Sequence, residues 1–97
     1  MLELLQEIGL PFAYSHFQKP VEPPYIVYIG NGQDNFGADN TWYHKRNRYQ
    51  LEYYFKKKDE GTEETIETIL LRNGYNYTKS EDVFVEGEGV FLIYYYI

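Results

Sequence analysis

The strongest constraint on the fold is a run of apolar and aromatic residues at positions 90–97, Val90-Phe91-Leu92-Ile93-Tyr94-Tyr95-Tyr96-Ile97. β-Branched and aromatic residues favour strands, so the run predicts a strand that is apolar on both faces. Such a strand is either central in a sheet, with helices on one side and a partner on the other, or an edge strand that must be covered. In both cases the run indicates association with another surface.

Two further strands are predicted from alternation and from the residues that bound them. Tyr25 to Ile29 form an apolar run between Pro24 and Gly30, which predicts a well-buried, central strand. From Thr41 to Lys58, apolar and polar residues tend to alternate, which predicts a long strand with one solvent-exposed face. Its buried face would carry Tyr43, Tyr49, Leu51, Tyr53 and Phe55, and its exposed face His44, Arg46, Arg48, Gln50, Glu52 and Lys56.

The segments around these strands are less regular. Phe12 to Phe17 alternate enough for a strand or an extended segment, and the prolines between Lys19 and Pro24 exclude a helix there. Residues 75–86 are expected to be extended. Gly30 to Asn40 are rich in Gly, Asn and Asp, so we expect a loop or an irregular hairpin connection rather than core.

Two helices are expected. Leu2 to Ile8 space their apolar residues about three apart and are followed by Gly9, which predicts a short helix. A second helix begins with Asp59 or Thr62 as its N-cap and ends at Asn73-Gly74. Acidic residues in its first turn complement the helix dipole and are expected to be solvated or to act as caps; they are Glu60, Glu63 and Glu64.

These elements together predict the fold class. A chain of 97 residues is the size of a single domain, so one domain is expected over residues 1–97. The order helix, strands, helix, strands predicts an α+β fold, in which a mixed, mainly antiparallel sheet has two helices packed on one face.

Composition excludes several classes of function. The net charge is -6 and the pI about 4.8, which disfavours sequence-independent binding to nucleic acid, because that needs clustered Lys and Arg. The chain contains no cysteine, so disulfides and thiolate metal sites are excluded, and a cytosolic site of synthesis fits. The pattern at residues 1–7 is not that of an export signal, and no apolar run approaches the ~20 residues of a membrane span.

No catalytic or metal-binding constellation is recognisable. His16 and His44 lie far apart, and neither has a second ligand at metal-binding spacing. Gly30-Asn31-Gly32 and Gly87-Glu88-Gly89 are better explained as turn glycines than as phosphate-binding loops. Ser15 and Ser80 lack the context of a nucleophile elbow. We therefore expect no enzyme activity, cofactor or metal, and expect surfaces to carry the function.

The chain has 12 tyrosines, more than a small core can hold with every hydroxyl near water. They pack well on strands, with their hydroxyls at the sheet margin, but tyrosine is also enriched at protein interfaces. Basic residues gather on the exposed face of the long strand, as ordinary solvated residues or as a stripe that meets the acidic helix of another copy. The candidate interface residues are Phe36, Trp42, Arg46, Arg48, Tyr94 and Tyr96.

Several short sequence segments, spread along the chain, resemble those of a known family. They are, in order, GLPFAYSHF at 9–17, PPYIVY at 23–28, DNFGADN at 34–40, and YQLEYY at 49–54 before KKD at 57–59. With the leucine-rich first helix, they resemble small tail proteins of tailed phages and prophages of Gram-positive bacteria, similar to the tail terminator, or tail-to-head joining, family.

The resemblance implies a structural virion protein. Members of that family are α+β subunits that form a homo-oligomeric ring, commonly a hexamer, which caps the tail tube and contacts the head connector. The implied location is the head–tail junction of the virion, and the host cytoplasm during assembly. An acidic ring suits a channel through which DNA slides without binding. Two alternatives stay open: a head-completion or tail-tube component, or a small acidic protein that acts as an inhibitor or adaptor.

Overall fold

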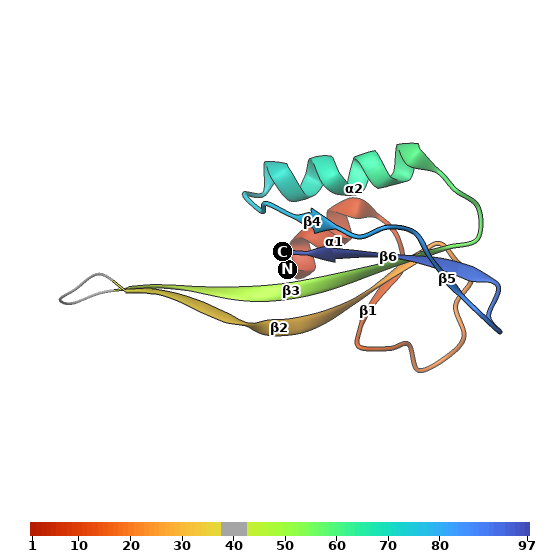
Figure 1. The fold of residues 1–97 in the computed structure, drawn as a ribbon, viewed down its shortest axis with the longest axis horizontal. Helices are drawn as coiled ribbons and strands as arrows, with labels where there is room; N and C mark the ends of the chain where they lie inside the picture. The colour runs from red at the N-terminus through yellow and green to blue at the C-terminus, as the bar shows by residue number, and fades with distance from the viewer. Residues whose placement is uncertain (38–42) are drawn as a thin grey trace.

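A computed structural model describes residues 1–37 and 43–97 as one sheet with two helices (Figure 1). Each helix and strand that it describes has the following bounds: α1 Leu2–Ile8, β1 Phe12–Tyr14, β2 Tyr25–Gly37, β3 Tyr43–Phe55, α2 Glu60–Arg72, β4 Thr78–Lys79, β5 Val83–Val85 and β6 Val90–Tyr96. The two expected helices and the long strand that precedes α2 are confirmed.

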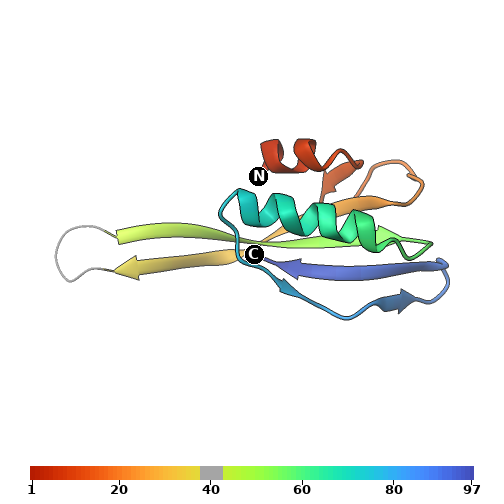
Figure 2. The same cartoon turned by 90° about the horizontal axis from the view of Figure 1, so that it is seen from above.

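The sheet is mixed and mostly antiparallel. Its strand order is β1-β2-β3-β6-β4, and β5 pairs with β6 beside β4. Only the β1–β2 pair is parallel among the described strands. Both helices lie on the same face of the sheet (Figures 1 and 2). The α+β fold predicted from the sequence is therefore confirmed, and β6 is an interior strand.

The core lies between the sheet and the two helices. On β3, Leu51, Tyr53 and Phe55 are buried, which confirms the predicted two-fold pattern. The facing strand residues and the helix residues complete one cluster of buried side chains, which also contains Leu4, Leu5, Ile26, Ile66, Ile69, Leu70, Ile93, Tyr95 and Ile97. Burial of this apolar surface is what holds the short helix α1 in place, because a helix of one to two turns is unstable alone.

Asp59 is the N-cap of α2. Its carboxylate accepts hydrogen bonds from the backbone N–H groups of Gly61 and Thr62, at 3.0 and 3.3 Å. The Thr62 hydroxyl donates to the same carboxylate at 2.9 Å, and Thr62, the other predicted N-cap, lies within α2. These bonds hold the pKa of Asp59 below its usual value, because they favour the charged form. At the other end Asn73 is the C-cap, and Gly74 follows with a φ of 86°.

Of the two alternatives predicted for Gly30 to Asn40, a loop or an irregular hairpin connection, the described residues as far as Gly37 form the irregular hairpin, because β2 continues to that residue. Its outer half pairs with β3 from Gln33↔Asn47 to Gly37↔Tyr43, after a bulge between Gly30 and Gln33. The bulge inserts one residue into β2, and Gly32 there has a φ of 83°, a left-handed conformation suited to glycine. Residues rich in Gly and Asn thus form a strand because the long, β-favouring partner β3 supplies the pairing.

The outer halves of β2 and β3 extend beyond the rest of the sheet. Pairing with β1 reaches Tyr28 on β2, and pairing with β6 reaches Gln50 on β3, with one further bond from the Ile97 N–H to the Tyr49 carbonyl. We call the ribbon formed by residues 29–37 and 43–48 the arm. It lengthens the molecule, which measures 52 × 26 × 24 Å, and it projects from one end in Figure 1.

Candidate subunit interface

The face of the sheet opposite the helices carries its own set of side chains. Paired residues of neighbouring strands share a face, and successive residues of one strand alternate between faces. Residues that pair with core residues therefore point towards the helices, and the residues between them point to the opposite side. We call this opposite surface the helix-free face. It is formed by Tyr25 and Val27 of β2, Gln50, Glu52 and Tyr54 of β3, and Leu92, Tyr94 and Tyr96 of β6.

A carboxylate lies at the centre of the helix-free face. Glu52 accepts a hydrogen bond from the Gln50 side-chain amide at 2.9 Å and another from the Tyr54 hydroxyl at 2.8 Å. All three side chains are half-buried. Burial and the bond to Glu52 raise the pKa of Tyr54, so its hydroxyl stays neutral and keeps its role as donor.

Aromatic rings stack on both sides of this carboxylate. Tyr25 stacks on Tyr54 with ring centroids 4.9 Å apart, and Phe17 contacts Tyr25 edge-on at 5.1 Å. Tyr94 and Tyr96 stack on each other at 5.9 Å. Burial and the nearby charge of Glu52 raise the pKa of Tyr94, so its hydroxyl also stays neutral. The face therefore offers flat, pre-ordered aromatic surface with neutral hydroxyl groups.

One end of the helix-free face is covered by the chain itself. Val27, Val90 and Leu92 are buried there, although they lie outside the core cluster beneath the helices. The segment 15–23 arches over this end and, with Tyr25, Tyr54 and Val90, lines an open hollow of about 660 Å³. The stack of Tyr94 and Tyr96 lies at the other end, where β3 enters the arm.

The predicted interface residues fall into three groups. Tyr94 and Tyr96 are adjacent on the helix-free face, and Arg48 joins Tyr96 in lining a small hollow of about 160 Å³. The structure thus brings these three together. Phe36 and Arg46 lie on the arm, paired through the backbone with His44 and Asp34, and their side chains are outside the described part of the structure. Trp42 lies wholly outside the described residues.

Sequence reasoning did not single out Glu52, Gln50, Tyr54 or Tyr25 as interface residues. The two-fold pattern did place Gln50 and Glu52 on the exposed face of the long strand. The missing information was the strand order, because Tyr25 and Tyr54 become neighbours only through the pairing of β2 with β3. The sequence did contain one signal for this cluster. In Gln50-Leu51-Glu52-Tyr53-Tyr54, an acid has a hydrogen-bond donor two residues away on each side, and all three side chains lie on one face of a strand.

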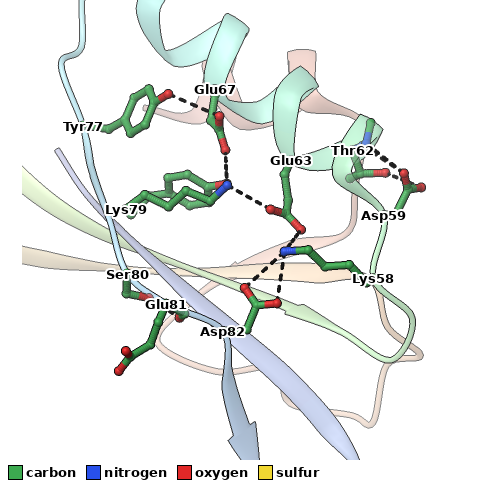
Figure 3. Close-up of polar contacts among 12 residues, drawn as sticks. Lys58, Asp59, Thr62, Glu63, Glu67, Tyr77, Lys79, Ser80, Glu81 and Asp82 are labelled. Carbon is green, nitrogen blue, oxygen red and sulfur yellow. Dashed lines mark hydrogen bonds and ion pairs between the residues drawn. The ribbon is translucent and has the colours of Figure 1, made fainter.

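A second polar cluster lies on the helix-covered side, and it corrects the expectation that Glu63 is a solvated acid (Figure 3). Glu63 is only 3% exposed. Its two carboxylate oxygens lie 2.7 Å from the Lys58 ammonium and 2.9 Å from the Lys79 ammonium. Lys58 also pairs with Asp82 at 3.0 Å. The pairing of β4 with β6 brings Lys79 beneath α2, and that tertiary contact is what encloses Glu63.

Glu67, one turn further along α2, extends this cluster. It accepts hydrogen bonds from the hydroxyls of Tyr95 and Tyr77, at 2.8 and 3.2 Å, and lies 2.8 Å from the Lys79 ammonium. Burial of Glu67 disfavours its charge, but these donors outweigh burial and hold its pKa below the usual value. The same two effects act on Lys79, whose pKa is raised by its carboxylate partners despite burial. The cluster ties α2 to β4 and β6.

The described residues contain no group of three or more His, Cys, Asp or Glu side chains placed to hold a metal ion. The ring of His16 instead contacts the hydroxyl of its neighbour Ser15 at 3.2 Å. Among the described helices, none combines the length and the apolar character that crossing a membrane requires.

Comparison with known proteins adds no family assignment. A scan against models of protein families and a search of curated proteins each found no match for this chain.

Proposed function

We propose that this chain is a structural virion protein of a tailed phage or prophage. In this proposal its copies form a ring that terminates the tail tube and joins it to the head. The proposal is supported by the family-like sequence segments spread over residues 9–59 and by the surfaces that the fold leaves available for other chains. The tail tube protein and the head connector protein would be its partners in the virion.

The observation that carries the proposal is the helix-free face. Two helices cover one side of the sheet. The other side displays the stacked pair Tyr94 and Tyr96, beside the Glu52 carboxylate and its two hydrogen-bond donors. Tyrosines contribute large contact areas at a small entropic cost, and they are enriched at the centres of interfaces. A stacked pair of this kind is better suited to contact between chains than to exposure to solvent.

The charge of the chain fits a channel for DNA. With a net charge of -6 per copy, a ring of copies would repel the phosphate backbone. DNA would then pass through the ring without being held, so we propose no specific nucleic-acid binding. Assembly would take place in the host cytoplasm, and the finished ring would lie at the head–tail junction.

The test is the absolute mass in solution, measured by light scattering after gel filtration from micromolar to millimolar concentration. We expect the mass to rise with concentration towards a closed ring. The double variant Tyr94→Ser with Tyr96→Ser should remain monomeric, because it removes the aromatic pair. The matched control is Tyr14→Ser, which changes a tyrosine that is exposed on β1 and belongs to neither the stack nor β6. It should assemble like the wild type.

Other outcomes would favour the alternatives. Growth into long tubes, seen by electron microscopy, would favour a tail-tube component, and a ring that binds heads but not purified tail tubes would favour a head-completion protein. A monomer at every concentration that also fails to bind tail tubes would contradict the proposal, and would favour the small acidic inhibitor or adaptor.

A further inference from the structure

In the described pairing of the sheet, the arm has an open backbone edge on the outer side of β3. Between Tyr43 and Asn47, this strand is paired with β2 on one side, and β6 begins its own pairing with β3 only at Gln50. A two-stranded ribbon is marginally stable in water, and an open strand edge is a template for pairing with another chain. The arm therefore gains stability if its β3 edge is covered.

A second open edge lies at β5. This strand, Val83–Val85, pairs with β6 on one side, and no strand of the described residues pairs with its other side. Its side chains are unusually exposed for apolar residues, with Val83 at 36% and Phe84 at 52%. Phe84 is held edge-on against Phe91 at 5.1 Å, so it is an ordered apolar group at the surface.

The two edges carry opposite charge. The arm contains Lys45, Arg46 and Arg48 against the single acid Asp34. The segment around β5 has the opposite composition, because residues 80–90 contain no basic residue and four acids, Glu81, Asp82, Glu86 and Glu88. Opposite charge on two open edges favours their encounter and sets which edge meets which.

The two edges do not meet within one molecule. The arm projects from one end of the long axis, whereas β5 lies at the opposite end, at the far margin of the sheet (Figures 1 and 2). A contact between them therefore joins two different copies and uses a different surface on each. Repeated contacts of this head-to-tail kind generate a ring when the rotation between copies closes, and a filament when it does not.

We infer that the β3 edge of the arm adds to the β5 edge of a second copy of this chain, so that a continuous sheet runs across the contact. Main-chain hydrogen bonds between the edges supply the pairing, Phe84 supplies an apolar contact, and the arm's basic residues face the acids around β5. The inference deepens the proposed function, on which it rests, by assigning the contact between neighbouring copies. It is a second contact surface beside the tyrosine stack.

Charge reversal on each edge tests this contact. The arm variant is Lys45→Glu with Arg46→Glu, and the edge variant is Glu81→Lys with Glu86→Lys and Glu88→Lys; the latter leaves Asp82 with its partner Lys58. Each variant alone places like charges on both edges, so each should remain monomeric at concentrations where the wild type assembles. An equal mixture restores opposite charge at every contact, and should regain wild-type mass with the two variants alternating.

The control for net charge is Lys19→Glu with Lys57→Glu, which changes the charge as much as the arm variant does at two exposed sites outside the arm. It should assemble normally. The readouts are light scattering of each variant and of the mixture, and native mass spectrometry of the mixture for its composition. Assembly by the single variants, or failure of the mixture to assemble while the wild type does, would overturn the inference and leave the proposed ring standing. A wild-type protein that neither assembles nor binds tail tubes would overturn both.

Discussion

The two faces of the sheet are built from the same strands, yet neighbouring residues on them have different environments. On β6, Tyr95 is fully buried beneath α2 and donates to Glu67, whereas Tyr94 is half-buried on the helix-free face and stacks on Tyr96. On β3, Leu51 is fully buried and Gln50 is not. The helix-covered face carries the core cluster, and the part of the helix-free face that the chain does not cover is available for contact with another chain.

The largest expected difference between the faces concerns side-chain volume. Leu51→Ala removes a fully buried side chain from the core cluster and should lower the free energy of unfolding by about 3 kcal/mol. Gln50→Ala, one residue away on the other face, loses one hydrogen bond to Glu52 and should cost less than about 1 kcal/mol. Urea unfolding measures both values. Equal costs would mean that the helix-free face is as important for stability as the core.

A smaller difference is expected from a single hydroxyl. Tyr95→Phe removes the buried donor to Glu67 and should cost about 2 kcal/mol, because hydrogen bonds to charged groups are the stronger ones. Tyr94→Phe keeps the ring stack and should change the unfolding free energy by less than about 0.5 kcal/mol. The comparison fails if the Tyr94 variant is the less stable of the two in thermal or urea unfolding.

The smallest effect is a dependence on pH. Because the pKa of Glu67 in the folded state lies below its usual value of 4.5, the unfolded chain takes up the proton first as the pH falls. The stabilising contribution of Glu67 is fully present above pH 4.5, and it is lost as the pH falls through the lower pKa of the folded state. Glu67→Gln should be about 1 kcal/mol less stable than the wild type at neutral pH.

The difference in unfolding free energy between the wild type and Glu67→Gln should become smaller in acid. Urea unfolding from neutral pH to below pH 4 measures it, with Glu64→Gln as the control, because Glu64 is an exposed residue on the same helix. A gap of constant size across this range would show that Glu67 is not stabilised as a carboxylate in the folded state.

Local patterns were enough to predict most of the fold. The two-fold alternation of Leu51, Tyr53 and Phe55 identified the buried side of β3, because period and burial are directly linked in a strand. Gly9 and Asn73-Gly74 marked the ends of the helices, because backbone conformation there depends on the residues themselves. The two faces of the sheet could therefore be assigned, in part, before the strands were ordered.

Features that depend on distant pairing could not be predicted. Glu63 has the sequence context of an ordinary first-turn acid, and only the return of β4 beneath α2 encloses it between two lysines. β2 continues past Gly30 because β3 is long enough to pair with it. The candidate site shows the same division. Tyr94 and Tyr96 were candidates because they lie in the aromatic run at residues 90–97, whereas the pairing that places Tyr25 on Tyr54 required the strand order.

The burial of Glu63 between Lys58 and Lys79 has an evolutionary consequence. Loss of both lysines would leave a buried, uncompensated carboxylate, whereas loss of Glu63 would leave two ammonium groups that water can still reach. Substitutions at these three positions should therefore be ordered in time, with the acid lost first. Homologues in which position 63 is apolar should tolerate neutral residues at 58 and 79, while those that retain the glutamate should retain at least one of the two cations.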